Sequence, residues 1–334
     1  MTFFSKIYNF YDKHLDGFTL AMVFTVILAV LLPAEGLAYR AVSFLSKLVI
    51  ASLFFMHGLK LSPQKLWAGL TNWRLHLVIV LATFLLFPLL GLGLKPVLTR
   101  LSSPDLYLGL LFLCFLPSTV QSSIAFTSIA NGNVAAAVCA ASASSLLGVF
   151  ITPVWVGLTL GASAGGSVGQ AIADLCLQLV LPFGLGQLAR LKLALWVERR
   201  RTMISYTDRL SVLFIVYSSF SHGTSSGLWG NLSWSIFLAL MVACALILTL
   251  ALIITHQAGL RLGFNRADRV VITFCGSKKS LISGVPMANI IFSPSQASSI
   301  ILPMMIFHQM QLLTCAYLAR RWGAKDAADA AKVE

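Results

Sequence analysis

Acidic residues are scarce in this sequence. Its 334 residues include 11 Asp and Glu against 24 Lys and Arg, and charged residues make up only 10% of the chain. Most of the acids fall in predicted loops or where hydrophobic segments begin. A metal-dependent hydrolase or a glycosidase needs carboxylates inside its site. The shortage of buried acids therefore argues against these classes, and we predict that the protein is not an enzyme.

Cysteine pairs and a secretion signal are also lacking. The six cysteines lie within apolar segments without the paired spacing of metal ligands, so they are interpreted as small buried hydrophobic residues. Residues 1–16 lack an apolar core followed by a cleavage site, and we expect no removable signal peptide. The net charge of +13 does not indicate nucleic acid as a partner, because the basic residues are confined to a few loops.

Hydrophobic residues are abundant, at 58% of the chain. Windows of about 20 apolar residues predict ten spans, and hence an all-α integral membrane protein whose surroundings are the lipid bilayer. The predicted spans lie near residues 17–33, 38–58, 75–94, 106–130, 134–160, 170–189, 209–222, 234–255, 269–292 and 297–319.

The ten predicted spans divide into two halves of five, 1–160 and 161–322, followed by a cytoplasmic tail at 323–334 that we expect to be frayed. Because five is odd, the halves are predicted to be inverted repeats. Basic residues concentrate in the loops on the side of the N-terminus, which predicts a multi-pass protein of the inner (plasma) membrane with both termini cytoplasmic. On that side we expect an amphipathic surface helix at 191–207, followed by a short seventh span.

The ninth span contains the residues that cost most to bury. Lys278 and Lys279 would lie about 15 Å into a hydrocarbon core about 30 Å thick, where a charge costs on the order of several kcal/mol. Gly276, Gly284 and Pro286 permit the helix to open, and opened backbone at that depth lines a cavity. We therefore predict a binding site in this span. Its other polar candidates are Ser277, Ser280 and Asn289.

The fourth span has the same character. Pro117 precedes a polar run inside a hydrophobic segment, and the run 121–124 can be aligned with 278–281. A matched pair of interrupted segments in the two halves of a chain indicates an inverted-repeat transporter and its substrate site. The polar candidates of the fourth span are Gln121, Ser122, Ser123, Asn131 and Asn133.

Two neighbouring spans add further polar residues. The serines of the fifth span, Ser142 to Ser145, favour close helix packing, with oxygen ligands for a cation or substrate as the alternative. In the last span His308, Gln309 and Gln311 form a cluster. A hydrogen-bonded structural histidine and a proton relay both remain open there.

The lysine pair also allows two interpretations. The ammonium groups could serve as fixed internal cations that satisfy the carbonyls of opened helices and hold the crossing together. Alternatively, one or both could bind an anionic substrate or change protonation during transport. The two roles are compatible with each other.

Four motifs in register resemble the bile acid:sodium symporter (BASS) superfamily over about residues 17–322. They are Leu116-Pro117, Gly132-Asn133-Val134, Gly276-Ser-Lys-Lys-Ser280 and Phe307-His308. Within this superfamily the chain is similar to a bacterial branch of sodium-dependent transporters related to the orphan seventh vertebrate member. The resemblance implies a panel domain of spans 1, 2, 6 and 7 and a core domain of spans 3–5 and 8–10. It also implies that spans 4 and 9 cross, with two sodium ions beside the crossing and an organic anion between the domains.

The resemblance places sodium ligands at Ser122, Ser123 and Ser142, but the ninth span departs from the pattern. The glutamate position of the family is Phe274 here, and its glutamine and asparagine positions are Lys278 and Lys279. We hypothesise that the ammonium groups occupy the space of the missing sodium ions, so that transport is sodium-independent or coupled to protons.

These observations predict a secondary transporter of a small organic anion that works by alternating access. No cofactor is expected, and sodium or a proton is the candidate coupling ion. The alternative function is a channel or a membrane regulator of ion homeostasis.

Overall fold

Helices account for all regular structure in the part of the chain that the computed structural model describes, namely residues 17–60, 72–96, 104–160, 168–227 and 233–330. This is expected of apolar segments in lipid, where each backbone N–H and C=O must be satisfied within the segment. The elements of the first half are α2 (Gly17–Leu31), α3 (Gly36–Lys60), α5 (Trp73–Leu81), the π-helix η2 (Ala82–Leu86), α6 (Phe87–Gly93), α8 (Pro104–Phe115), α9 (Gln121–Ile129) and α10 (Val134–Leu160). Those of the second half are α11 (Val168–Arg199), α12 (Arg201–Ser225), α13 (Trp234–Arg261), α14 (Arg266–Gly276), α15 (Leu281–Ile291) and α16 (Pro294–Ala330).

Six helical stretches within the described ranges are long and apolar enough to cross a membrane. They are Gly36–Lys60, Trp73–Gly93, Val134–Thr159, Leu179–Arg199, Trp234–Arg261 and Gln296–Ala324. Two shorter apolar stretches, Leu20–Leu31 and Leu106–Phe115, accompany them. The prediction of an all-helical membrane protein is confirmed. The count of ten spans stays a prediction.

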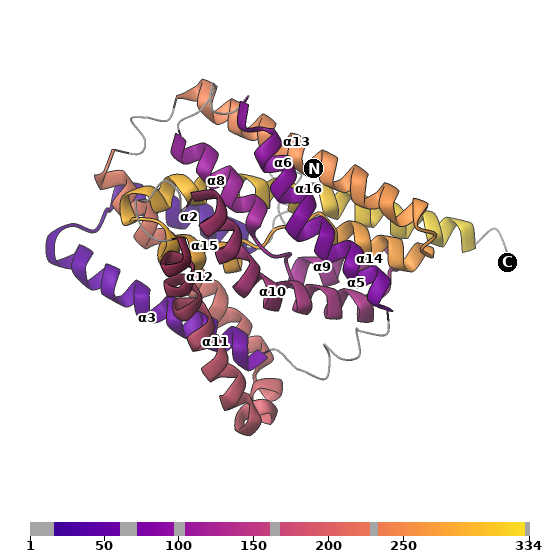
Figure 1. The fold of residues 1–334 in the computed structure, drawn as a ribbon, viewed down its shortest axis with the longest axis horizontal. Coiled ribbons are helices and arrows are strands. Elements are labelled where there is room, and N and C mark those ends of the chain that lie inside the picture. The colour runs from indigo at the N-terminus through magenta and orange to yellow at the C-terminus, as the bar shows by residue number, and fades with distance from the viewer. Residues whose placement is uncertain (1–16, 61–71, 97–103, 161–167, 228–232, 331–334) are drawn as a thin grey trace, which may run out of the picture.

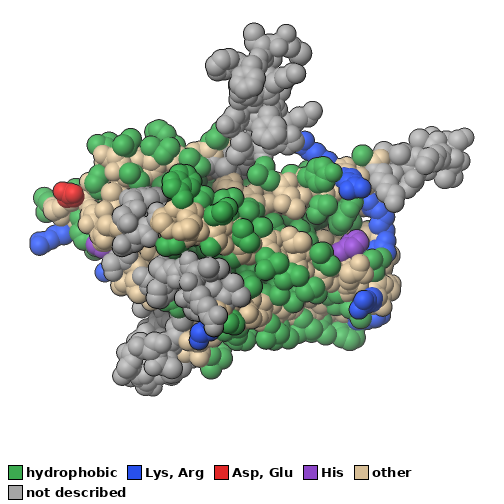
Figure 2. All heavy atoms as spheres, turned by 90° about the horizontal axis from the view of Figure 1, so that it is seen from above, with side chains coloured by type: hydrophobic (Ala, Val, Ile, Leu, Met, Phe, Trp, Pro, Cys, Tyr) green, Lys and Arg blue, Asp and Glu red, His purple; other side chains and the backbone are tan. Residues whose placement is uncertain are grey.

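Hydrophobic side chains cover the outside of the bundle. Figure 2 shows them over the middle of the molecule, with Lys and Arg side chains mainly towards its two ends. Large apolar residues such as Leu37, Leu191 and Leu238 are exposed on helix faces. A soluble protein rarely exposes so much apolar surface, whereas a lipid-facing surface requires it.

The helices pack in two sets. The first contains α3 alongside α11 and α2 alongside α12, and the pair α3 and α11 lies in the lower part of Figure 1. In the second set α16 packs against α8, α13 and α15, and α14 packs against α13 and α5. Contacts of α12 with α15 and α16, and of α10 with α11, connect the two sets.

Both predicted interruptions are present. The non-helical segment 116–120 separates α8 from α9, and 277–280 separates α14 from α15. The two segments meet, because the backbone N–H of Ser280 donates to the carbonyl of Pro117 at 2.8 Å. Gly276 ends α14 as expected for an opened helix. Gly284 and Pro286, however, lie inside α15, so the prediction that they open the helix is wrong. A Cβ at Gly284 would stand 2.4 Å from Leu116 Cδ1, so this glycine permits the close approach of α15 to the fourth span.

Three boundary predictions are also wrong. The stretch 191–207 is not a separate surface helix, because α11 runs on to Arg199 and α12 begins at Arg201. Val197 and Ile204 are buried against Leu59 of α3, and this packing draws the stretch into the bundle. The seventh span is therefore not short, since α12 has 25 residues. The tail is helical as far as Ala330, which agrees with its alanine-rich sequence; residues 331–334 lie outside the described ranges.

Candidate functional site

The opened fourth span leaves four carbonyls without their helical partners, and each has found another donor. The carbonyls of Cys114 and Leu116 accept from the ammonium group of Lys279, and that of Pro117 accepts from the backbone of Ser280. The remaining carbonyl, of Phe115, accepts from the hydroxyl of Thr152 at 2.8 Å. Buried backbone groups need such partners. Residues of other spans therefore supply donors to these four carbonyls.

The Lys279 ammonium group lies where three carbonyls converge. Its Nζ is 2.6 Å from the oxygen of Thr83, 2.9 Å from that of Cys114 and 2.7 Å from that of Leu116. An ammonium group has three N–H donors, so all of them are used. The ring of Phe87 covers the same Nζ, which lies 4.2 Å from the ring centroid. Lys279 is 1% exposed. This is a closed cation cage built of backbone oxygens and aromatic faces.

The carbonyl of Thr83 is available because of Pro88. In η2 the N–H of Phe87 donates to the carbonyl of Ala82. The next residue, Pro88, has no N–H to offer to Thr83 or Phe84. Two side chains replace it, since Lys279 donates to Thr83 and the indole of Trp155 donates to the carbonyl of Phe84 at 3.0 Å. Sequence reasoning missed Thr83, although Pro88 inside a hydrophobic span is a visible signal that carbonyls about one turn earlier are free.

Gln311 holds the backbone of Lys279 in the opened segment. Its Oε1 accepts from the Lys279 N–H at 2.8 Å, and its Nε2 donates to the Lys279 carbonyl at 2.9 Å. The same Nε2 is 3.0 Å from Nδ1 of His308, one helical turn away on α16. Gln309, the third member of the predicted cluster, is half-buried and faces away from this pair by its position on the helix. The i, i+3 spacing of His308 and Gln311 places these two side chains on the same face of α16.

The Lys278 ammonium group has far fewer partners. It is 0% exposed, yet the hydrogen bond described for it is a single long one, 3.4 Å to the hydroxyl of Ser122. The rings of Phe126 and Phe274 lie 4.2 and 5.7 Å from Nζ, measured to their centroids.

A chain of hydroxyls leads away from Lys278. Ser122 donates to Thr119 at 2.9 Å, and Thr119 is 2.9 Å from Ser123. Ser123 donates to the carbonyl of Phe274 at 3.3 Å. Each hydroxyl has one proton, and Ser123 already donates its proton to the carbonyl of Phe274. In the bond between Thr119 and Ser123, Thr119 is therefore the donor. Ser122 and Ser123 were predicted, whereas Thr119 was missed.

Nearby serines take structural positions. Ser118 donates through its hydroxyl to the carbonyl of Cys275 at 2.6 Å, and its N–H donates to Ser144 at 2.9 Å. Ser277 donates to the carbonyl of Thr273, and Ser280 caps the N-terminus of α15. Ser142 is half-buried and takes no part in the hydrogen bonds that the structure describes around the crossing. That Ser122, Ser123 and Ser142 share a sodium site stays a prediction.

The predicted asparagines lie away from the two lysines. Asn131 is exposed in a turn with φ 51° after α9. Asn133 donates to Asp268 at 2.9 Å and caps α10 by accepting from the N–H of Ala136. Asn289 accepts from Ser219 of α12 at 2.9 Å, so it joins the two sets of helices. None of the three contacts the lysine pockets.

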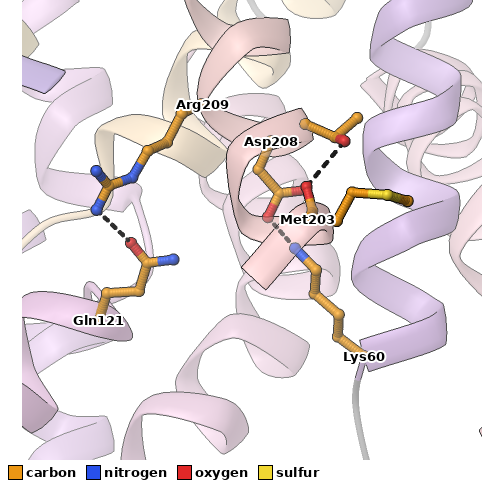
Figure 3. Close-up of polar contacts among 6 residues, drawn as sticks. Lys60, Gln121, Met203, Asp208 and Arg209 are labelled. Carbon is orange, nitrogen blue, oxygen red and sulfur yellow. Dashed lines mark hydrogen bonds and ion pairs between the residues drawn. The ribbon is translucent and has the colours of Figure 1, made fainter. Parts of the chain in front are cut away.

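Gln121 faces the other set of helices. In Figure 3 the guanidinium of Arg209, on α12, points to Gln121 at the start of α9, at 3.5 Å. Beside it, Lys60 at the end of α3 pairs with Asp208 of α12. Gln121 therefore contacts α12, a helix of the first set. Its neighbour in sequence, Ser122, is the hydrogen-bond partner of Lys278.

Comparisons with known proteins decide the family. Residues 16–324 match the SBF-like CPA transporter family. The chain belongs to this family. It is 51% identical to "Uncharacterized protein PA2026" of Pseudomonas aeruginosa over 96% of both chains. It is 48% identical to "Putative symporter YfeH" of Escherichia coli over 92% of this chain and 93% of the relative. It is 31% identical to "Sodium/bile acid cotransporter 7" of Rattus norvegicus over 80% of each.

Membership of the SBF-like CPA transporter family confirms the resemblance to the bile acid:sodium symporters and makes the protein a membrane transporter. Phe274 is the residue that the resemblance aligns with a glutamate of the family. Its ring packs against Phe126 and Trp322, with centroids 6.1 and 5.3 Å away. Phe274 is therefore part of an aromatic cluster with Phe126 and Trp322.

Proposed function

We propose that this protein is a secondary transporter of a small organic anion in which the ammonium groups of Lys278 and Lys279 replace the sodium ions of related symporters. The observation that carries the proposal is the cage of three carbonyls around Lys279. Carbonyl oxygens are the ligands that a hard cation such as sodium prefers, and one lysine already uses them with all three N–H donors.

The rest of the expected sodium site supports the same proposal. The oxygen of Ser122 already accepts from the Lys278 ammonium group, and that of Ser123 accepts from the Thr119 hydroxyl. The side chain of Phe274 supplies no ligand. The donor set therefore fits two ammonium groups better than two metal ions. Without acids in either lysine pocket, as far as the chain is described, a cleft beside the crossing attracts anions. The rat relative is named for a bile acid, which is an organic anion, and also for sodium.

Alternating access is the mechanism we propose, with α2, α3, α11 and α12 as the panel and the remaining helices as the core. The packing of α3 on α11 and of α2 on α12 supports this division. So does the presence of two broken helices at equivalent places, α8–α9 and α14–α15. Ten crossings result when each broken pair counts once and α5, η2 and α6 count as one span. The Arg209–Gln121 contact would then be one that forms and breaks as the panel moves.

The test is thermal unfolding of the purified protein in detergent, with sodium chloride titrated against potassium chloride at constant ionic strength. A ligand that binds only the folded state raises the unfolding temperature by mass action. We expect equal unfolding temperatures in the two salts. A saturable stabilisation specific to sodium would overturn the replacement of sodium by lysine.

Transport itself is tested in proteoliposomes at a clamped membrane potential. Bile acids and smaller carboxylates serve as labelled probes, with sodium or a proton gradient applied in turn. We expect saturable uptake of an anion without sodium. An ion current without saturable uptake would favour a channel or regulator instead.

A further inference from the structure

A basic cavity lies apart from the lysine pockets, where α13 and α16 end and α14 begins. Its volume is about 640 Å³, within the usual size range of small-ligand sites. Arg266, Arg269, Arg321, His256 and Trp322 contribute to its lining, and no acid is among its described lining residues. Figure 2 shows Lys and Arg side chains and a histidine gathered at the right-hand end, where α14 lies and α16 ends in Figure 1.

The acid nearest in sequence does not neutralise these arginines. Asp268 is buried and accepts from Asn133 and Asn265, each at 2.9 Å, and from Asn72 at 3.4 Å. Arg266 is held in place by two backbone carbonyls, those of Ala130 at 3.2 Å and Trp322 at 3.1 Å. Three arginines thus line one cavity, and an anion bound among them offsets the repulsion of their like charges.

We propose that this cavity binds a phosphate-bearing anion. Guanidinium groups are planar forks that pair with phosphate oxygens by two parallel hydrogen bonds, and they stay charged at every accessible pH. A cavity with several of them and an aromatic wall at the end of membrane helices fits a phosphate better than a carboxylate alone. The phosphate comes either from an anionic phospholipid or from a soluble ligand, because basic pockets between spanning helices take both.

The position of the cavity links it to the lysine site. The ring of Trp322 lies between His256 and Phe274, with centroids 5.4 and 5.3 Å away. Phe274 in turn lies 5.7 Å from Nζ of Lys278. Arg266 also donates to the carbonyl of Ala130 at the end of α9. The first turn of the same helix contains Ser122, the hydrogen-bond partner of Lys278. An occupant of the cavity would therefore reach the Lys278 pocket through two aromatic residues, Trp322 and Phe274. This regulatory part rests on the proposed transport function, whereas the binding itself does not.

Binding is measured on the delipidated full-length protein by thermal unfolding, with three probes titrated separately: inorganic phosphate, phosphatidylglycerol and phosphatidylcholine. The variant is Arg269→Gln/Arg321→Gln. The matched control is Arg261→Gln, an exposed arginine at the end of α13 that does not line the cavity. We expect phosphate or phosphatidylglycerol to raise the unfolding temperature of the wild type and the control. In the double variant the apparent Kd should rise about tenfold or more, as the loss of charged hydrogen bonds predicts.

Stabilisation by phosphatidylglycerol alone would assign the cavity to a lipid headgroup, and stabilisation by inorganic phosphate would assign it to a soluble ligand. Equal responses of the double variant and of Arg261→Gln would overturn the site, because they would reduce it to general surface charge. So would a wild type that responds to phosphatidylcholine as strongly as to the anions. The sodium titration described above is independent of these outcomes, so either proposal can fail alone.

Discussion

Lys278 and Lys279 are neighbours in sequence and are equally buried, yet their surroundings differ completely. Lys279 has three carbonyls for three N–H donors and an aromatic cover. Lys278 has one long hydrogen bond to a hydroxyl and two aromatic faces. A charge that is fully paired is fixed in place, whereas a buried charge with spare donors gains from a change of protonation or from an anionic ligand.

The two lysines fit different ones of the two roles considered above, a fixed internal cation and a group that binds an anion or changes protonation. Lys279 fits the fixed internal cation that holds the crossing of the broken helices. Lys278 fits the group that changes state during transport, because little in its pocket would have to be broken for it to do so. Substitutions at each residue should therefore act on different properties.

Lys279→Met should have the largest effect on stability. It leaves the carbonyls of Thr83, Cys114 and Leu116 buried without donors, and we expect a loss of about 3–5 kcal/mol in the free energy of unfolding. The measurement is the unfolding midpoint in detergent, with the exposed Lys47→Met of α3 as control. If the two variants unfolded alike, the cage would have no structural role.

Gln311→Leu should come second. It removes the partners of both the N–H and the carbonyl of Lys279, at a cost of about 2–4 kcal/mol. The same unfolding experiment on Gln309→Leu, two residues away on α16, should give a much smaller change, since Gln309 makes no described contact with the crossing. A larger loss of stability in Gln309→Leu than in Gln311→Leu would contradict the role of Gln311 in holding the Lys279 backbone.

Lys278→Met should change stability least, within about 1 kcal/mol in either direction, because replacing a poorly paired buried charge by an apolar chain of similar length is often neutral. Anion uptake into proteoliposomes should nevertheless be lost. This variant sharpens the comparison, since Lys279→Met loses folded protein and Lys278→Met loses only transport. A Lys278→Met protein with normal uptake at every pH would remove Lys278 from the mechanism.

Much of the site could be predicted because proline, glycine and lysine inside hydrophobic segments are rare and costly. Pro117, Gly276 and the lysine pair marked the two openings correctly. Gly284 and Pro286 were misassigned because the same residues that open a helix also allow close packing, and the packing of Leu116 against α15 is not visible in a linear pattern. Thr83 was missed because only its backbone takes part, and a carbonyl has no sequence signature of its own.

The sequence alone determined that this protein lies in a membrane, that two of its helices are interrupted, and that two lysines are buried there, since hydropathy and the cost of charge in lipid are local properties. The tertiary structure decided which lysine is paired. The partners of Lys279 come from α5–η2–α6, α8 and α16, and those of Lys278 from α9 and α14. Such convergence depends on how distant spans cross, and a chain of adjacent residues does not specify it.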